Sequence, residues 1–301
     1  MLLDAASLYY RAFYGVPESV TAPDGTPVNA VRGFCDTIAA LLREHRPERL
    51  VACWDDDWRP DFRVAALPTY KAHRVGADGG EETPEALRPQ VPLIADVLAA
   101  VGIARLGSPG YEADDVIATL TTRAVAAGRA VDVVTGDRDL FQLVDDTGHV
   151  RVLYTGRGLK RLETVDTAAL RERYGVGSGA AYSDLAVLRG DPSDGLPGVA
   201  GIGEKTAATL LARHRDLAGV LAAAADPDGD LTPAQRRKLL AAGEYLSAAP
   251  AVVRCVRDVP LPDGQGDLLP RTAADPQHLQ VLAERWGLAS SVQRLLAALP
   301  S

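Results

Sequence analysis

The sequence predicts an α/β fold, in which a mostly parallel central sheet is flanked by helices. Short apolar runs alternate with amphipathic segments up to about residue 165, and this alternation is typical of a parallel sheet covered on both faces. After that point strands largely stop, and residues 166–250 have the pattern of helices separated by Gly and Pro turns. We therefore expect an α/β core over 1–165, a helical region over 166–257, and a linker with a C-terminal helix over 258–301 that packs back on the core.

The apolar spacing and the turn residues define the elements of the core. Apolar runs bounded by turn residues predict buried strands, and apolar residues every three or four positions predict helices. The expected elements are, in chain order, a strand at 2–3, helices over 8–13 and 31–42, a strand over 49–54, helices over 93–101 and 111–128, and strands over 130–135 and 150–154. Residues 76–90 interrupt this order with Gly, Pro and charged residues, which is typical of a mobile functional loop. A connection over 258–276 leads to a last amphipathic helix over 278–299.

Composition and charge exclude some classes of protein. The apolar fraction of 47% is normal for a packed globular protein, and no apolar run approaches the roughly 20 residues that a membrane helix needs. Asp4 comes too early for a signal peptide, so we expect a cytoplasmic protein without a membrane partner. The three cysteines lack metal-ligand spacing and are expected to be buried thiols. The net charge is −8, but basic residues gather over 59–74 and 236–238, so the acidic total does not exclude DNA.

Acidic residues gather where an α/β domain opens its cleft. They lie in three phrases, over 111–115, 135–139 and 190–194, and directly after two further strands, at Asp4 and Asp55. Acids at helix starts can simply cap the helix, and for Glu112 alone that explanation is equally good. Capping does not explain acids after three separate strands, whose carboxyl ends meet at one crevice. Oxygen-only ligands suit Mg²⁺ or Mn²⁺, and a pair of such ions suits phosphodiester cleavage.

A Gly-rich segment over 195–203 precedes Glu204, Lys205 and Thr206. The glycines permit a tight turn, and the free N–H groups at the next helix start would bind a phosphate without reading the base sequence. A plain helix–helix connector is the alternative interpretation. Elsewhere, Tyr70 lies next to Lys71 and near Arg74, and it is a candidate for stacking on a base.

Together these motifs resemble the 5′-nuclease family, which includes the 5′→3′ exonuclease domain of bacterial DNA polymerase I and the related stand-alone flap endonucleases. The likeness covers nearly the whole chain and includes Leu3-Asp4-Ala5, Tyr70 to Arg74, Gly110 to Asp115, Thr135 to Leu140, Leu188 to Asp194 and the hairpin. It implies a PIN-like nuclease core with an arch or clamp over about 63–92, through which a 5′ strand passes. It also implies a helix–three-turn–helix (helix-hairpin-helix) unit that binds duplex DNA.

The resemblance implies a role for each matching residue. The metal ligands would be Asp4, Asp55, Glu112, Asp114, Asp115, Asp137, Asp139, Asp191 and Asp194. The catalytic cations would be Lys71, Arg74 and Arg11. The DNA-binding residues would be Arg63, Tyr70, Gly198, Gly201, Gly203, Lys205 and Thr206. The chain departs from the family pattern at Ala5 and Gly195, where Gly and Asn are usual, and the run Asp55-Asp56-Asp57 makes the position of that ligand ambiguous.

The function that follows is a structure-specific 5′ nuclease, acting as 5′→3′ exonuclease and 5′-flap endonuclease by a two-metal-ion mechanism in DNA replication and repair, such as Okazaki fragment or flap processing. The expected partners are a DNA flap or a 5′ end at a duplex junction, RNA–DNA hybrid as a secondary substrate, and K⁺ at the hairpin. No polymerase domain follows residue 301, so a free-standing nuclease is expected. We also expect the protein to be a monomer. The alternative is a catalytically inactive DNA-junction-binding protein, which would gain nothing from mutually repelling carboxylates that face phosphates.

Overall fold

A six-stranded sheet forms the centre of the computed structural model, which describes residues 1–77, 79–262 and 266–300. The strands lie in the order β3-β2-β1-β4-β5-β6. β1 to β5 pair in parallel, and β6 pairs antiparallel to β5. Their bounds are β1 (Leu2–Asp4), β2 (Val51–Cys53), β3 (Ala104–Leu106), β4 (Val131–Thr135), β5 (Val150–Tyr154) and β6 (Glu163–Val165). The predicted fold class, a mostly parallel sheet flanked by helices, is confirmed.

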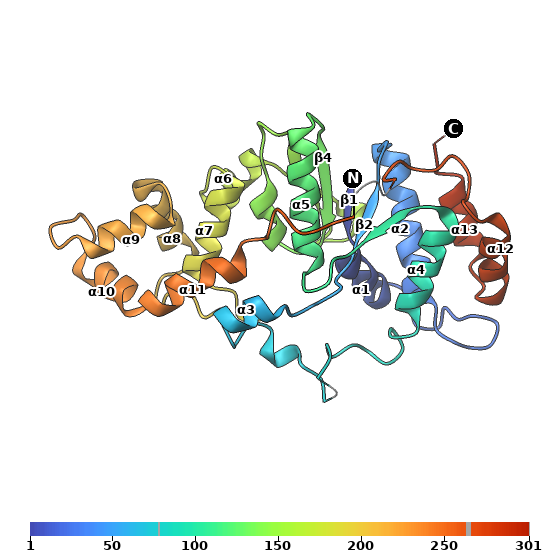
Figure 1. The fold of residues 1–301 in the computed structure, drawn as a ribbon, viewed down its shortest axis with the longest axis horizontal. Coiled ribbons are helices and arrows are strands. Elements are labelled where there is room, and N and C mark those ends of the chain that lie inside the picture. Colours follow the sequence, from blue (N-terminus) through green and yellow to red (C-terminus); the bar gives the residue numbers. More distant parts are fainter. Residues whose placement is uncertain (78, 263–265, 301) are drawn as a thin grey trace.

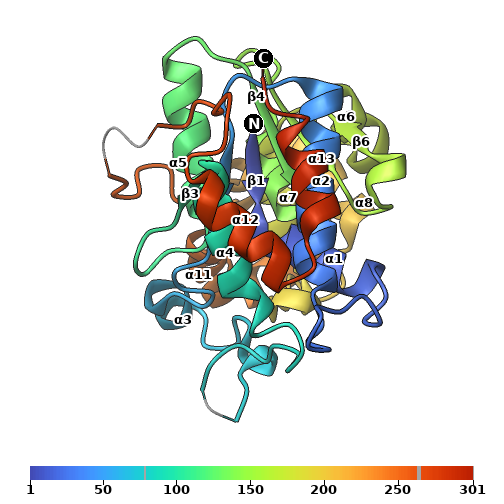
Figure 2. The same cartoon turned by 90° about the vertical axis from the view of Figure 1, so that its right-hand side faces the viewer.

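Successive residues of each strand face opposite sides of the sheet, which creates two hydrophobic cores. Leu3 packs in one core and Leu2 in the other. The first core is closed by α1 (Ala5–Gly15), α2 (Asn29–His45), α4 (Gln90–Val101), α12 (Pro276–Arg285) and α13 (Ala289–Leu296) (Figure 2). The second core is closed by α5 (Ala113–Ala126) and continues into the helical region. The three cysteines are buried and free.

The helical region extends from one end of the sheet (Figure 1). It consists of α6 (Thr167–Tyr174), α7 (Gly179–Arg189), α8 (Glu204–His214), α9 (Leu217–Ala225), α10 (Pro233–Ala241) and α11 (Gly243–Val253). α3 (Asp61–Ala66) packs beside α11. From α3 the chain runs along the lower edge in Figure 1 to α4, with η1 (Ala72–Arg74) as its one short helical turn among the residues described there. Within the described chain, no helix is both long and apolar enough to cross a membrane.

Some expected elements differ from the observed ones. The single helix expected over 278–299 is wrong, because the chain breaks at Gly287, which has φ +64°, and forms α12 and α13 instead. These two helices pack against α4 and α2. The short strands β3 and β6 were missed because each buries only its last residue, so neither forms the continuous apolar run by which the equally short β1 and β2 were recognised. The domain boundaries at residues 165 and 257 stay predictions.

Candidate active site

A cavity of about 510 Å³ opens beyond the carboxyl ends of β1, β2 and β4. β1 and β4 are neighbours in the sheet. β2 and β3 are added on the far side of β1, and β5 and β6 on the far side of β4, so the strand order reverses between β1 and β4. Such a switch point is where open parallel sheets bind ligands. The acids that line the cavity are Asp4, Asp55, Glu81, Glu112, Asp114, Asp137 and Asp191, and they are joined by Lys71 and Arg74.

Asp4 lies at the centre of this crevice because it is both the last residue of β1 and the N-cap of α1. One carboxylate oxygen accepts a hydrogen bond from the backbone N–H of Ser7 at 3.1 Å, and the other accepts from the Thr135 hydroxyl at 2.6 Å. Burial raises the pKa of Asp4 to about 7, and Asp55 and Asp137 add to the shift by repulsion. The carboxylate is therefore costly to ionise without a cation nearby.

The three acids of the run Asp55-Asp56-Asp57 lie in different surroundings. Asp55 lines the cavity and accepts a hydrogen bond from the backbone N–H of Ala113 at 2.8 Å. Asp56 lies close against Gly107, and Asp57 accepts from the backbone N–H of Arg59. Burial raises the pKa of Asp55. Of these three acids, Asp55 is the one that lines the cavity, and its role as a metal ligand stays a prediction.

The start of α5 brings two more acids to the cavity wall. Glu112 is the N-cap residue, and its carboxylate accepts from the Tyr70 hydroxyl at 2.8 and 3.0 Å and from Lys71 Nζ at 3.0 Å. Burial raises the pKa of Glu112 to about 7, although Lys71 and Arg63 oppose the shift. The pKa of Asp114 is raised well above its usual range by burial and by repulsion from Asp137 and Asp4.

The structure places three predicted site residues away from their expected roles. Asp115 is fully buried and does not line the cavity; it pairs with Arg63 through bonds of 2.7 and 2.8 Å. Arg63 is only 2% exposed and Tyr70 only 3%. We therefore correct these assignments: Asp115 is not placed to bind a metal, and Arg63 and Tyr70 are not placed to touch DNA. The physical reason is that each group is enclosed by partners within the protein.

The remaining predicted ligands come from the turns after β4 and after α7, and of these Asp137 and Asp191 line the cavity, whereas Asp139 and Asp194 lie beside its lining. Asp191 lines the cavity and caps η4 (Pro192–Asp194). Asp194 accepts a hydrogen bond from Arg74 Nη2 at 2.6 Å. Asp139 follows Asp137 in η2 (Asp139–Leu143), and its pKa is raised well above its usual range by burial and by repulsion from Asp137, Asp194 and Asp191. These four acids therefore share one electrostatic environment.

Arg11 lies beside the cavity rather than in its lining. It lines an adjoining cavity of about 920 Å³ that shares Ser7 and Tyr10 with the acidic one. Its Nε is buried without a hydrogen-bond partner. Sequence reasoning missed Glu81, which comes from the loop before α4 and lines the acidic cavity. Burial raises the pKa of Glu81, and repulsion from Asp55 adds to the shift. Glu81 lies in a loop rich in turn residues, and nothing in its local sequence indicated that it would reach the cavity.

The segment between α7 and α8 forms a tight hairpin. Gly198 has φ +67°, and a Cβ there would lie 2.3 Å from the carbonyl oxygen of Arg189, so the turn requires glycine. Gly201 has φ +73°, and a Cβ there would lie 2.6 Å from Lys238 Nζ. The same ammonium group donates a hydrogen bond to the carbonyl oxygen of Gly201 at 2.9 Å. Gly203 is the N-cap of α8 and has open space around it. Lys205 is exposed and Thr206 half-exposed in the first turn of α8, so phosphate can approach this helix start.

The donor set fits divalent ions that keep part of their water. Within the described residues, no three His, Cys, Asp or Glu side chains converge closely enough to hold an ion unaided. The cavity acids are nevertheless all oxygen donors, and burial raises the pKa of several of them. Mg²⁺ usually retains several water ligands and binds only a few carboxylates directly. The wide, acid-lined cavity is therefore compatible with hydrated ions.

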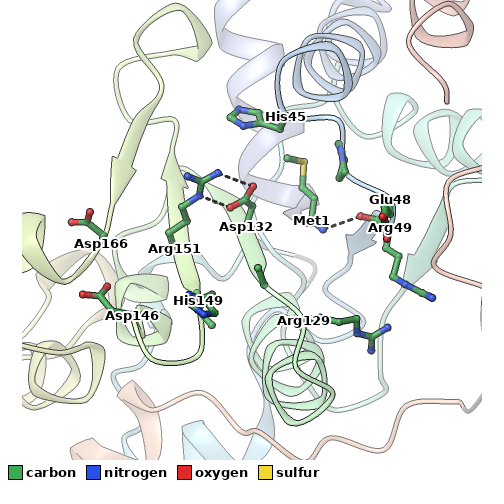
Figure 3. A pocket seen from close by; sticks show the side chains of 13 residues that line it. Met1, His45, Glu48, Arg49, Arg129, Asp132, Asp146, His149, Arg151 and Asp166 are labelled. Atoms are coloured by element: carbon green, nitrogen blue, oxygen red, sulfur yellow. Dashed lines mark hydrogen bonds and ion pairs between the residues drawn. The ribbon is translucent and has the colours of Figure 1, made fainter. Parts of the chain in front are cut away.

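A third cavity lies at the opposite, N-terminal edge of the strands (Figure 3). It has a volume of about 740 Å³, and its lining mixes acids with Arg and His. Arg151 pairs with Asp132 at 2.6 Å, and the Met1 amine donates to the carbonyl oxygen of Arg49. Because parallel sheets bind ligands at the carboxyl ends of their strands, we do not assign the active site to this cavity.

Comparison with known proteins identifies the family. Residues 1–175 match the family model for the 5′-3′ exonuclease N-terminal resolvase-like domain, and residues 178–276 match that for the 5′-3′ exonuclease C-terminal SAM fold. A 5′-3′ exonuclease of Streptomyces coelicolor is 62% identical over 304 residues, which cover 99% of both chains. DNA polymerase I of Mycobacterium tuberculosis strain H37Rv is 43% identical over 87% of this chain and 27% of its own length.

A solved structure shares the fold at lower identity. The bacteriophage T5 D15 flap endonuclease, in a pseudo-enzyme-product complex with DNA and metal ions, superposes with a TM-score of 0.64 and 16% identity, over 99% of this chain and 98% of that one. Taken with the sequence matches, these findings show that the chain belongs to the 5′-3′ exonuclease family. The predicted family and the predicted class of enzyme, a 5′→3′ nuclease, are confirmed.

Proposed function

We propose that this protein is a structure-specific 5′ nuclease that hydrolyses DNA phosphodiesters, as exonuclease and flap endonuclease, with two divalent metal ions. The observation that carries the proposal is the convergence of acids from separate segments on one cavity at the switch point of the sheet. The hairpin before α8 supports it, because an exposed helix start beside Lys205 can bind a phosphate backbone. Replication and repair, where flaps and nicks arise, are the corresponding processes.

The cavity acids would hold Mg²⁺ or Mn²⁺ in two groups. Of the acids that line the cavity, Asp4, Asp55, Glu112 and Asp114 would form one group, and Asp137 and Asp191 would belong to the other. Asp139 and Asp194, which lie beside the lining, would complete the second group. When bound, such ions lower the pKa of a water ligand and offset the negative charge of the transition state. Lys71 and Arg74 lie at the mouth, bonded to Glu112 and Asp194. Both cations would donate to the phosphate oxygens as charge develops on them.

The substrate is proposed to be DNA with a 5′ flap or a 5′ end at a duplex junction. The duplex would contact the α8 start, and the 5′ strand would pass beneath the segment that joins α3 to α4. The T5 D15 flap endonuclease, crystallised with DNA, has the same fold. RNA–DNA hybrid is proposed as a secondary substrate and a monomer as the active form. A K⁺ ion at the hairpin would have to compete with Lys238 for the carbonyl oxygen of Gly201.

Cleavage of 5′-labelled flap, nicked and blunt duplex substrates tests the proposal. We expect products with Mg²⁺ or Mn²⁺ and none with chelator. Asp137→Asn should abolish cleavage and keep flap binding, because it removes one cavity acid without changing the hairpin. Asp132→Asn, at the opposite edge of the sheet, is the matched control and should cleave normally. Binding without cleavage by the unmodified protein at any metal concentration would instead support the inactive junction-binding alternative.

A further inference from the structure

Tyr70 occupies a place in the structure that suits a different role from base stacking. Its ring is buried, and its hydroxyl reaches both carboxylate oxygens of Glu112, at 2.8 and 3.0 Å. We propose that Tyr70 is a positioning residue, whose hydroxyl fixes the Glu112 carboxylate at the wall of the active-site cavity. The inference rests on the proposed function, because it assumes that Glu112 contributes to metal binding there.

The donors that contact Glu112 come from one short segment. Lys71 Nζ lies 3.0 Å from Oε2 and Arg63 Nη1 lies 3.6 Å from the same oxygen, so residues 63–71 surround this carboxylate. Glu112 itself stands at the start of α5, about 40 residues further along the chain. Partners that hold a metal-binding side chain in place typically matter for metal affinity or activity almost as much as the ligand does. The segment 63–71 therefore supplies the groups that orient Glu112.

The position of Tyr70 is itself closely determined. Its backbone N–H donates to the carbonyl oxygen of Leu67 at 2.9 Å, and its carbonyl accepts from Arg59 Nε at 2.6 Å. The next residue, Lys71, takes a left-handed backbone conformation with φ 47°, and its N–H donates to the carbonyl oxygen of Asp194 at 3.0 Å. The turn at 67–71 thus touches both groups of cavity acids, Glu112 on one side and Asp194 on the other.

The packing between the turn and the hairpin leaves little room for movement. A Cβ at Gly195 would lie 2.1 Å from the carbonyl oxygen of Thr69, so the two backbones meet directly. The Thr69 hydroxyl donates to the carbonyl oxygen of Gly195 at 2.8 Å. Because Tyr70 is only 3% exposed, a DNA base could reach its ring only by displacing the groups that cover it. The geometry therefore assigns the hydroxyl, rather than the ring face, as the functional part of Tyr70.

Tyr70→Phe separates the two roles, since it keeps the ring and removes only the hydroxyl. We expect kcat on a 5′ flap to fall about 10- to 100-fold, or the Mn²⁺ concentration needed for half-maximal rate to rise by a similar factor. The dissociation constant for the same flap, measured in chelator, should stay within about twofold. Tyr174→Phe, which alters a tyrosine packed in the aromatic cluster around Phe141, is the matched control and should change neither quantity.

A double variant shows whether Tyr70 acts through Glu112. If it does, adding Tyr70→Phe to Glu112→Gln should cost much less than it costs in the unmodified protein, because the partner has already been altered. Equal losses in both backgrounds, or a weaker flap affinity with kcat unchanged, would overturn the proposal. So would a Tyr70→Phe variant with normal kcat and normal metal dependence.

Direct metal binding distinguishes failure of this inference from failure of the proposed function. Calorimetric titration of Mn²⁺ into the DNA-free protein needs no cleavage. Weaker binding by Tyr70→Phe, with an unchanged melting temperature, supports the positioning role even if flap cleavage were absent. Identical titrations for the variant and the unmodified protein, combined with normal cleavage by both, would reject the positioning role and leave the nuclease assignment intact.

Discussion

Substituting Arg63 by Met should destabilise the protein strongly, although a basic residue in this motif would ordinarily be expected to contact DNA. Arg63 joins three parts of the chain. Its guanidinium bonds Asp115 at 2.7 and 2.8 Å, and its Nε donates to the carbonyl oxygen of Val252 at 3.0 Å. The side chains of the pair are 2% and 0% exposed. Methionine fills a similar volume but leaves the carboxylate of Asp115 buried without its cation.

Removing one partner of a buried ion pair typically costs about 3–5 kcal/mol. We expect the lower end, about 3 kcal/mol, because Asp115 keeps hydrogen bonds from the backbone N–H groups of Val256 and Glu112. At about 2–4 °C per kcal/mol, the melting temperature should fall by about 6–12 °C. Arg151→Met is the matched control: its pair with Asp132 is 48% and 23% exposed, and such surface pairs contribute about 1 kcal/mol or less.

Thermal melts and flap-binding measurements on the same preparations decide the question. The double variant Arg63→Met with Asp115→Asn should lose less stability than the single variants predict by addition, because the unpaired charge is gone. A single Arg63→Met variant that melts normally but binds DNA more weakly would refute the reasoning. In that case the side chain would have to leave its buried position to contact the phosphate backbone.

Three further outcomes are expected. Burial raises the pKa values of Asp4 and Glu112 to about 7, from 3.8 and 4.5. Between about pH 4 and 7 the folded protein without added metal therefore holds protons that the unfolded chain has lost, so its melting temperature should fall as the pH rises through this range. Mg²⁺ should restore the melting temperature at pH 8, because it binds the folded state. A pH-independent melt in chelator would contradict this. Gly198→Ala should lower both melting temperature and flap affinity, since a Cβ has no room there, whereas Gly203→Ala should melt normally. Lys205→Ala should reduce the slope of log affinity against log salt by about one, with no change in melting; an unchanged slope would remove Lys205 from the DNA contacts.

The positions of the acids that directly follow strands could be predicted from the sequence, because the topology of the sheet determines where the strands end. Once β1, β2 and β4 are recognised as parallel, their carboxyl ends must lie at one edge of the sheet. Asp4, Asp55 and Asp137 then approach the same crevice whatever the details of packing. The Gly-rich hairpin could be predicted for a similar local reason, since the positive φ of Gly198 and its contact with the preceding helix end require glycine.

The role of Asp115 could not be predicted in this way. Residues three positions apart share a face when both lie within a helix, but Glu112 has φ −84° and ψ 163°, outside the helical region. The periodicity of α5 therefore begins only at Ala113, and adjacent residues of a helix point about 100° apart. Asp114 faces the cavity, while Asp115 faces Arg63. The three-residue spacing rule holds only within a helix, so it does not predict which way the side chains at a helix start point.

The burial of Arg63 and Tyr70 was equally hidden from the sequence. Charged side chains are mostly exposed, so a basic run beside an aromatic residue suggests a nucleic-acid surface. The partners that make burial tolerable, Asp115 and Glu112, come from a segment 42 to 52 residues away. No local pattern reveals a pairing over that distance, and it is the tertiary packing of α3 beside α11 that places Arg63 next to the start of α5.

Two of the cations that line the cavity are bonded to acids, which has a consequence for the order of binding. Lys71 pairs with Glu112 and Arg74 with Asp194. A phosphate that approaches must compete with these carboxylates, whereas a divalent ion would attract the carboxylates and free Lys71 and Arg74 for DNA. We therefore expect flap affinity, measured by fluorescence anisotropy at constant ionic strength, to rise when Ca²⁺ replaces Na⁺, because Ca²⁺ takes the same oxygen ligands. The rise should be lost in Arg74→Gln. An affinity that falls with Ca²⁺, as screening of phosphate contacts alone would produce, would show that these cations are already available to DNA before the metals bind.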